Sequence, residues 1–195
     1  KNDRKPLILR GARQVGKTTA INLFSKQFDQ YLYLNLEIKA ERVIFEQNHS
    51  IEELLQAIFF YKNQQNRKGA VLIFIDEIQN CPSAVSYLRY FYESFPDLYV
   101  IAAGSLLETP IDTHISFPVG RVEYLVMRPL SFKEFLSALS ETASLDILNK
   151  TPVPDFAHDK LMKLFNTYAI IGGMPEVVQK YSVHKDIISL NSIFD

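Results

Sequence analysis

The stretch GARQVGKTT, residues 11–19, constrains the fold of this chain more than any other part of the sequence. It holds two of only seven glycines, Gly11 and Gly16, and Lys17 and Thr18 follow at once. This spacing fits G-x-x-x-x-G-K-[ST], a loop whose backbone N–H groups wrap phosphate oxygens. Glycine suits such a loop because it tolerates positive φ angles and close backbone approach.

The flanking sequence supplies the context that this loop needs. The apolar run PLILRG before it predicts a buried strand, and Ile21, Phe24 and Phe28 recur at helical spacing after it. A helix N-terminus at this point favours a bound anion. We therefore expect ATP or ADP and Mg²⁺ as ligands, with Lys17 on the β- and γ-phosphates and Thr18 on the metal. The residues expected to line the nucleotide are Gly11, Ala12, Arg13, Gln14, Val15, Gly16, Lys17, Thr18 and Thr19.

A second acidic motif follows about 60 residues later. The run AVLIFIDE, residues 70–77, is nearly all apolar before Asp76 and Glu77, as in a strand covered on both faces. A carboxylate at Asp76 could help to hold Mg²⁺, and Glu77 could deprotonate the attacking water. The structural alternative is that acids commonly end a buried strand where the chain leaves the core. Gln79 is a weaker candidate for contact with the γ-phosphate.

Strands and helices alternate along the first two-thirds of the chain. Further strands are expected at 31–37, 98–105 and 121–129, and a helix is expected from Pro82. Ser50 with Glu53 and Ser131 with Glu134 have the spacing of capping boxes, so helices are expected after Ser50 and after Ser131. This alternation predicts a three-layer α/β fold with a mostly parallel sheet. We expect an ATPase core over residues 1–130 and a helical region over 131–195.

The composition mainly argues against certain classes of partner and site. The net charge of −1 gives no general attraction to nucleic acid or to anionic membranes, and no apolar run is long enough to span a bilayer. The single cysteine, Cys81, fits a reducing, cytoplasmic setting, and the four histidines lack metal-ligand spacing. Since the chain begins with Lys1 and stops abruptly at Asp195, we expect it to be a piece of a longer protein.

The motifs GARQVGKTT, VLIFIDEIQ, AAGS, GRVEYLVMRPLSFKEF and GGMPE occur in this order. The sequence thereby resembles the prokaryotic AAA-type ATPases that carry a C-terminal domain thought to be nuclease-like. The resemblance implies a P-loop NTPase fold of the AAA/ASCE type, with an additional strand between the two phosphate motifs. It also implies a helical lid from near Ser131 and a missing C-terminal domain. Ala12 departs from the family pattern, which usually has proline there.

The resemblance also suggests catalytic residues beyond Lys17 and Glu77. Ser105, after the strand VIAAG, would be the sensor residue. Arg121 is the candidate for a transition-state arginine, acting within its own subunit or on a neighbour in a homo-oligomer. The alternative for Arg121 is a strand-entry arginine that pairs with an acid. Arg13 and Arg128 are weaker candidates for the same role.

Two functions remain open from the sequence. The first is an Mg-dependent ATPase that drives or gates an attached effector domain; the second is a nucleotide-dependent switch with little turnover. A small-molecule kinase is disfavoured because residues 131–171 contain no arginine, and a GTPase because no Asn-Lys-x-Asp motif is present. Nucleic acid would be contacted through the missing domain, since nothing in this segment supports it.

Overall fold

The computed structural model describes residues 4–47, 50–65, 68–104, 118 and 120–186. The chain divides into two compact units, Lys1–Met127 and Arg128–Asp195, and each is considered by itself. The boundary expected from the sequence was residue 130. Ser105, which was expected to follow a strand, lies outside the described residues.

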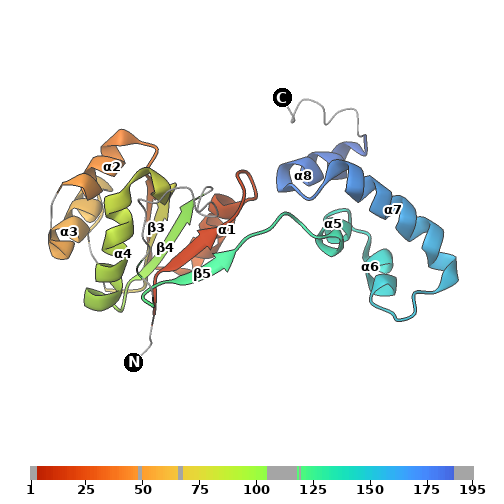
Figure 1. Ribbon diagram of the computed structural model, residues 1–195, viewed down its shortest axis with the longest axis horizontal. Helices are drawn as coiled ribbons and strands as arrows, with labels where there is room; N and C mark the ends of the chain where they lie inside the picture. Colours follow the sequence, from red (N-terminus) through yellow and green to blue (C-terminus); the bar gives the residue numbers. More distant parts are fainter. Residues whose placement is uncertain (1–3, 48–49, 66–67, 105–117, 119, 187–195) are drawn as a thin grey trace. The chain divides into compact units, whose positions relative to one another are not determined.

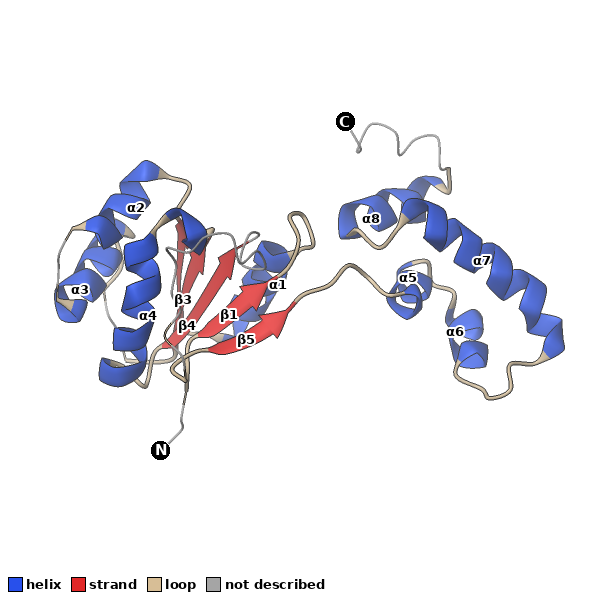
Figure 2. Ribbon diagram, in the orientation of Figure 1, coloured by secondary structure: helices blue, strands red, loops and turns tan. Residues whose placement is uncertain are grey.

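The first unit alternates strands and helices (Figures 1 and 2). Its elements in chain order are β1 (Leu7–Arg10), α1 (Lys17–Phe24), β2 (Gln30–Asn35), α2 (Lys39–Glu46), α3 (Ile51–Tyr61), β3 (Val71–Asp76), α4 (Pro82–Ser94), β4 (Tyr99–Gly104) and β5 (Glu123–Val126). Single turns of 3₁₀ helix follow α1 and β3, at Ser25–Gln27 and Ile78–Asn80.

The five strands form one parallel sheet in the order β2-β3-β4-β1-β5. Strand β4 lies between β1, which precedes the glycine loop, and β3, which ends in Asp76. This is the additional strand between the two phosphate motifs, and the expected α/β P-loop NTPase fold is confirmed. Because all strands run the same way, their carboxyl ends share one edge of the sheet, where ligands of such folds usually bind.

Each face of the sheet carries its own apolar core. Strand residues alternate between faces, so one set packs under α2, α3 and α4 and the other under α1. The first core includes Phe45, Leu54, Ile75, Leu88 and Phe91, which are all at most 1% exposed. The second includes Leu9, Ile21, Leu72, Phe74 and Ile101. Strand β3 is buried at all six residues, as its unbroken apolar run predicts.

Two elements differ from their sequence-based outlines. Helix α2 was not predicted, because it is only eight residues long and its N-cap, Ile38, makes no side-chain capping bond. Strand β5 covers only Glu123–Val126 of the expected 121–129. All four of its residues are exposed, since β5 pairs with β1 alone and forms an edge of the sheet.

The second unit is helical, with α5 (Phe132–Ala138), α6 (Thr142–Leu148), α7 (His158–Ile171) and α8 (Pro175–His184). Ser131 and Glu134 form a complete capping box at the start of α5, as their spacing predicts. The segment GGMPE is a tight turn, in which a Cβ on Gly173 would lie 2.1 Å from the Leu130 carbonyl oxygen. Within the described residues, no helix is both long and apolar enough to cross a membrane.

Candidate nucleotide site

The loop after β1 has the backbone that its glycines predict. Gly11 has φ +151°, and a Cβ there would lie 2.3 Å from the Met127 carbonyl oxygen. Gly16 has φ +95° and ends the loop at the start of α1, and Gln14 also has a positive φ of 61°. Alternating right- and left-handed residues turn successive N–H groups toward one point, which makes an anion-binding concavity. The loop is therefore shaped to receive a phosphate group at the N-terminus of α1.

Lys17 is the first residue of α1 and is only 6% exposed. Its ammonium group donates 2.8 Å hydrogen bonds to the carbonyl oxygens of Gly11 and Ala12. A buried ammonium needs such acceptors, because an unpaired buried charge is costly. The two bonds hold the positive charge inside the loop, within reach of a phosphate bound there.

Thr18 and Asp76 meet at the carboxyl edge of the sheet. The Thr18 hydroxyl donates a 2.8 Å hydrogen bond to Asp76 Oδ2, and the other carboxylate oxygen accepts the Glu77 N–H at 3.0 Å. Asp76 is 5% exposed, so its position is fixed by packing as well as by these bonds. A hydroxyl and a carboxylate are the hard oxygen ligands that Mg²⁺ prefers. The side chains present therefore fit a magnesium ion next to a bound phosphate chain.

Tyr33, on β2, is a third partner of Asp76 that the sequence did not reveal. Its hydroxyl donates to Asp76 Oδ2 at 3.3 Å, and its ring packs against Phe74 with 5.4 Å between ring centres. The register pairs Asn35 with Asp76, which puts the end of β2 beside the end of β3. A tyrosine in an apolar strand has no motif, so only strand pairing identifies it.

Burial raises the pKa of the Asp76 carboxyl, and the neighbouring Glu77 charge adds to this. Hydrogen bonds from Thr18, the Glu77 N–H and Tyr33 act in the opposite direction. Burial and the Asp76 charge raise the pKa of Tyr33 to about 12, so its hydroxyl keeps its proton at neutral pH. The hydrogen bonds to Asp76 favour its charged form, but burial outweighs them, so the pKa of its carboxyl is raised overall.

Glu77 follows Asp76 directly and has a left-handed backbone, with φ 51°. The Gln79 side-chain amide donates a hydrogen bond to Glu77 Oε2. Gln79, which was considered as a phosphate contact, therefore touches the expected general base. The carboxylate of Glu77 is only partly buried, so a water molecule can approach it.

Arg121 lies far from the glycine loop. It precedes β5, and the Glu123 N–H donates to the Pro6 carbonyl, so Arg121 lies at the amino edge of the sheet. The glycine loop leaves β1 at the opposite edge, about 13 Å or more away along a four-residue strand. Arg121 Nε instead pairs with Glu93 Oε1 at 2.7 Å. The structure therefore places Arg121 and the P-loop of the same subunit at opposite ends of the strands.

Arg121 shares Glu93 with Arg89, which bonds the same carboxylate oxygen at 2.9 Å. The two guanidinium groups hold the pKa of Glu93 below its usual range. Arg121 therefore has the arrangement of the alternative considered from the sequence, an arginine before a strand that pairs with an acid, and Glu93 is that acid.

The remaining expected residues take varied positions. Val15 is buried and anchors the loop, whereas Thr19 is exposed on α1. Arg13 lies 3.8 Å from Glu37, with both side chains more than half exposed. Cys81 is buried and unoxidised. Among the described residues, no group of three or more histidine, cysteine or acidic side chains is arranged to hold a metal.

A family model described as an AAA domain matches residues 3–136. No protein with a curated description matches the sequence. The solved structure of PCH-2 from C. elegans is similar, with a TM-score of 0.54 and 17% identity, covering 92% of this chain and 55% of that one.

The structure of Drosophila ORC bound to DNA is similar to the same degree. Its TM-score is 0.54 at 14% identity, with 92% of this chain and 55% of that chain covered. This chain therefore spans about half the length of both solved chains. At these identities the likeness shows a shared fold and nothing further.

Proposed function

Because this chain belongs to the AAA domain family, we propose that its nucleotide-binding ATPase module binds Mg-ATP and hydrolyses it to drive or gate an attached effector domain. The observation that carries the proposal is the 2.8 Å hydrogen bond between Thr18 and Asp76, with Glu77 as the next residue. In this arrangement the phosphate loop, the two oxygen ligands expected for Mg²⁺ and the candidate base Glu77 lie together at the carboxyl ends of the strands.

Binding begins with the loop between Gly11 and Thr18. Its backbone N–H groups and the N-terminus of α1 receive the β-phosphate, as in other anion sites at helix ends. Lys17 exchanges its bonds to the Gly11 and Ala12 carbonyls for bonds to phosphate oxygens. Thr18 and Asp76 would hold Mg²⁺, which neutralises charge on the β- and γ-phosphates.

The chemistry that we propose is an in-line attack of water on the γ-phosphorus. Glu77 orients the water and accepts its proton as the new oxygen–phosphorus bond forms. The bond between the γ-phosphorus and the bridging oxygen breaks, and that oxygen keeps the electron pair in ADP. Gln79, bonded to Glu77 Oε2, holds the base in one orientation until water binds.

Two further residues, Ser105 and Arg121, complete the proposed site. Ser105 would sense the γ-phosphate, and Arg121 would act on the nucleotide of a neighbouring copy in a homo-oligomer. We propose that the helices after residue 130 form the lid of the site, in a cytoplasmic protein. A further domain, and not this segment, would make any contact with nucleic acid.

The placement of Arg121 favours one alternative, a nucleotide-dependent switch with little turnover. Arg121 is held by Glu93 at the far edge of the sheet, so a lone subunit lacks a transition-state arginine from that position. A switch would bind ATP through the same loop and change its contacts with a partner without hydrolysis.

Turnover and binding of Mg-ATP and Mg-GTP by the whole chain separate these functions. We expect Lys17→Ala to abolish nucleotide binding, and Glu77→Gln to retain binding but to lower turnover by about 100-fold or more. Glu52→Gln, at an exposed glutamate on α3, is the matched control and should change neither.

Tight binding without turnover at any protein concentration would favour the switch. Equal turnover by the parent chain and by Glu77→Gln would show that Glu77 is not the base. Binding that survives Lys17→Ala unchanged would contradict the P-loop assignment itself.

A further inference from the structure

Strand β2 is an edge strand with part of its hydrogen-bonding side open. It is the first strand in the order β2-β3-β4-β1-β5, and within the described residues it pairs with β3 alone. An open strand edge is a template for another strand, and proteins usually block it with charges, proline or covering segments. The backbone N–H and C=O groups of β2 that lack a hydrogen-bond partner determine what can bind along this strand.

The pairing with β3 determines which residues face outward. The N–H groups of Gln30 and Leu36 donate to the carbonyls of Ala70 and Asp76 on the β3 side. Backbone groups in a parallel strand alternate between its two neighbours, so the even-numbered residues of β2 face β3. The N–H and C=O groups of Tyr31, Tyr33 and Asn35 therefore face away from the sheet.

Both ends of this outer edge are blocked by the chain itself. At the carboxyl end, the Asn35 N–H donates to the Glu41 carboxylate, and its carbonyl accepts the Ile38 N–H. At the amino end, the Tyr31 carbonyl accepts the Gln64 side-chain amide at 3.3 Å. Among the described residues, no partner is found for the N–H groups of Tyr31 and Tyr33 or for the Tyr33 carbonyl. These three groups form a short ladder of donor, donor and acceptor.

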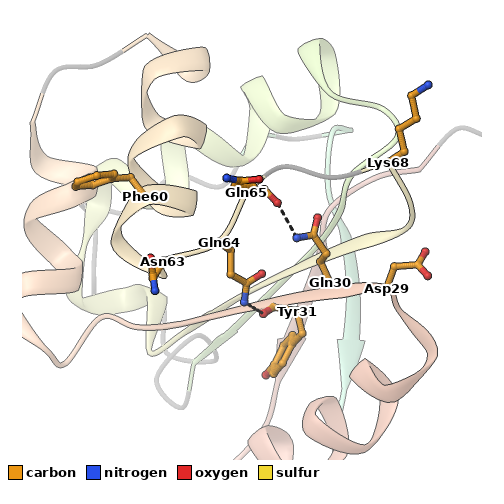
Figure 3. A pocket seen from close by; sticks show the side chains of 8 residues that line it. All are labelled: Asp29, Gln30, Tyr31, Phe60, Asn63, Gln64, Gln65 and Lys68. Carbon is orange, nitrogen blue, oxygen red and sulfur yellow. Dashed lines mark hydrogen bonds between the residues drawn. The ribbon is translucent and has the colours of Figure 1, made fainter.

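A cavity of about 800 Å³ opens at the amino end of the same edge. Its lining is mostly polar, and Phe60 is the large apolar side chain among the residues that form it: Asp29, Gln30, Tyr31, Phe60, Asn63, Gln64, Gln65 and Lys68. Figure 3 shows Phe60 and Lys68 at opposite ends of the cavity, with Gln64 and Gln65 between them. Phe60 is 88% exposed, which is unusual for a phenylalanine at the end of a helix whose other face is buried.

One contact in this cavity imitates that of a neighbouring strand, and a second bond beside it is made by a side chain of β2. Gln64 uses an amide N–H to bond a strand carbonyl, and the Gln30 side chain bonds the Gln65 carbonyl at 2.8 Å (Figure 3). Both bonds are exposed to solvent, so another amide can replace them at little cost. The position beside β2 is therefore already used by amide groups of the kind that a peptide backbone supplies.

We propose that an extended segment of a partner protein binds along the outer edge of β2 as a sixth strand, with an apolar side chain packed on Phe60. Its backbone pairs with the Tyr31 N–H and with the N–H and carbonyl of Tyr33, and its apolar residue packs on Phe60 at one end of the cavity, whose other lining side chains are mostly polar. Main-chain bonds supply affinity and the side-chain pocket supplies selectivity, as in other strand-addition complexes.

The blocked ends favour a flexible peptide over a second copy of this chain. If two β2 edges paired around a two-fold axis, the Gln64–Gln65 segment of one copy would meet the Ile38–Glu41 turn of the other. Only a strand without such flanking elements fits the open stretch between Tyr31 and Tyr33.

The test uses the whole chain without nucleotide and a labelled synthetic octapeptide of alternating leucine and threonine. The matched peptide is the same sequence with alternate backbone nitrogens methylated, which removes the pairing donors and keeps the side chains. We expect the first peptide to bind with a Kd of roughly 10–100 μM and the methylated one not to bind. Amide exchange at Tyr31 and Tyr33 should slow by about tenfold or more, because both N–H groups become bonded.

Phe60→Ser tests the apolar contact at a residue that is too exposed to support the fold. It should weaken peptide binding by about tenfold, the value of a well-packed aromatic contact. Phe156→Ser, at a residue that is 80% exposed in the second unit, is the matched control and should leave binding unchanged.

Three results would overturn the proposal. They are no binding of the octapeptide at about 1 mM, binding that is insensitive to Phe60→Ser, and protection of Tyr31 and Tyr33 that rises with protein concentration alone. The last would assign the edge to a second copy. None of these results depends on ATP hydrolysis, so they are independent of the test of the ATPase.

Discussion

Thr18 donates a 2.8 Å hydrogen bond to Asp76 although 58 residues separate the two in the chain. The bond exists because β1 and β3 are parallel and end at the same edge of the sheet, with β4 between them. It brings together one residue from each of the two motifs. Any nucleotide bound by the loop therefore lies next to the acidic end of β3.

We expect Thr18→Ala to weaken ATP binding in the presence of Mg²⁺ by about tenfold, because one hard-oxygen ligand is lost. Thr18→Ser keeps the hydroxyl and should bind nearly as well as the parent chain. Titration calorimetry with Mg²⁺ and with EDTA measures both effects. If the loss for Thr18→Ala were equally large in EDTA, the hydroxyl would contact the nucleotide and not the metal.

Gly11→Ala should destabilise the first unit by about 2 kcal/mol or more, since the new Cβ meets the Met127 carbonyl oxygen at 2.3 Å. Gly120→Ala is the matched control, because Gly120 also has a positive φ, +75°, but no atom of the described residues lies within 4 Å of the added carbon. Its cost should be only the backbone strain, about 1 kcal/mol. Urea unfolding of the two variants gives the comparison. Equal losses would mean that the loop moves away from Met127 without penalty.

Glu41, on α2, links the end of β2 to Lys62, the residue that follows α3. Its carboxylate is 6% exposed, accepts the Asn35 N–H and pairs with Lys62 Nζ at 2.6 Å. Glu41→Ala should therefore cost roughly 3 kcal/mol of unfolding free energy, since it leaves an N–H and an ammonium without their partner. Lys62→Met should cost less, because the methionine keeps the apolar stem and Asn35 keeps its acceptor.

A double-mutant cycle on Glu41 and Lys62, followed by urea unfolding, measures the coupling between them. We expect a coupling of about 1 kcal/mol or more, given the burial of the carboxylate. A coupling near zero would show that Glu41 acts only through the Asn35 N–H.

Tyr33 leads to a prediction about pH. A tyrosine titrates near pH 10 in the unfolded chain, and the pKa of Tyr33 in the folded chain is raised to about 12. Between these values the folded state holds the proton more tightly, so the stability that Tyr33 contributes is complete below pH 10 and is lost as the pH rises to 12. Thermal melts from pH 9 to 12 should fall less steeply for Tyr33→Phe than for the parent chain. Parallel curves for the two proteins would contradict the raised pKa.

Much of the fold follows from local sequence. The apolar run before Asp76 predicted a strand buried on both faces, and β3 is buried at all six positions. The Ser50–Glu53 and Ser131–Glu134 spacings predicted capping boxes, and both are complete. Local signals suffice in these cases because the stabilising contact lies within one turn of helix or along one strand. Helix α2 escaped prediction because its stabilising residue, Glu41, bonds to Lys62 and Asn35 outside the helix.

The sequence by itself determined the phosphate loop, since glycine spacing dictates where the backbone can take positive φ angles. It also determined the acidic strand end and the alternation of strands and helices. Only the tertiary structure decided that Tyr33 bonds to Asp76 and that Arg121 pairs with Glu93 at the amino ends of the strands. It also decided that, within the described residues, Tyr31 and Tyr33 have unpaired backbone groups on the outer side of β2. The physical reason is that strand order and register set these neighbours, and both are properties of the whole sheet that no single stretch of sequence contains.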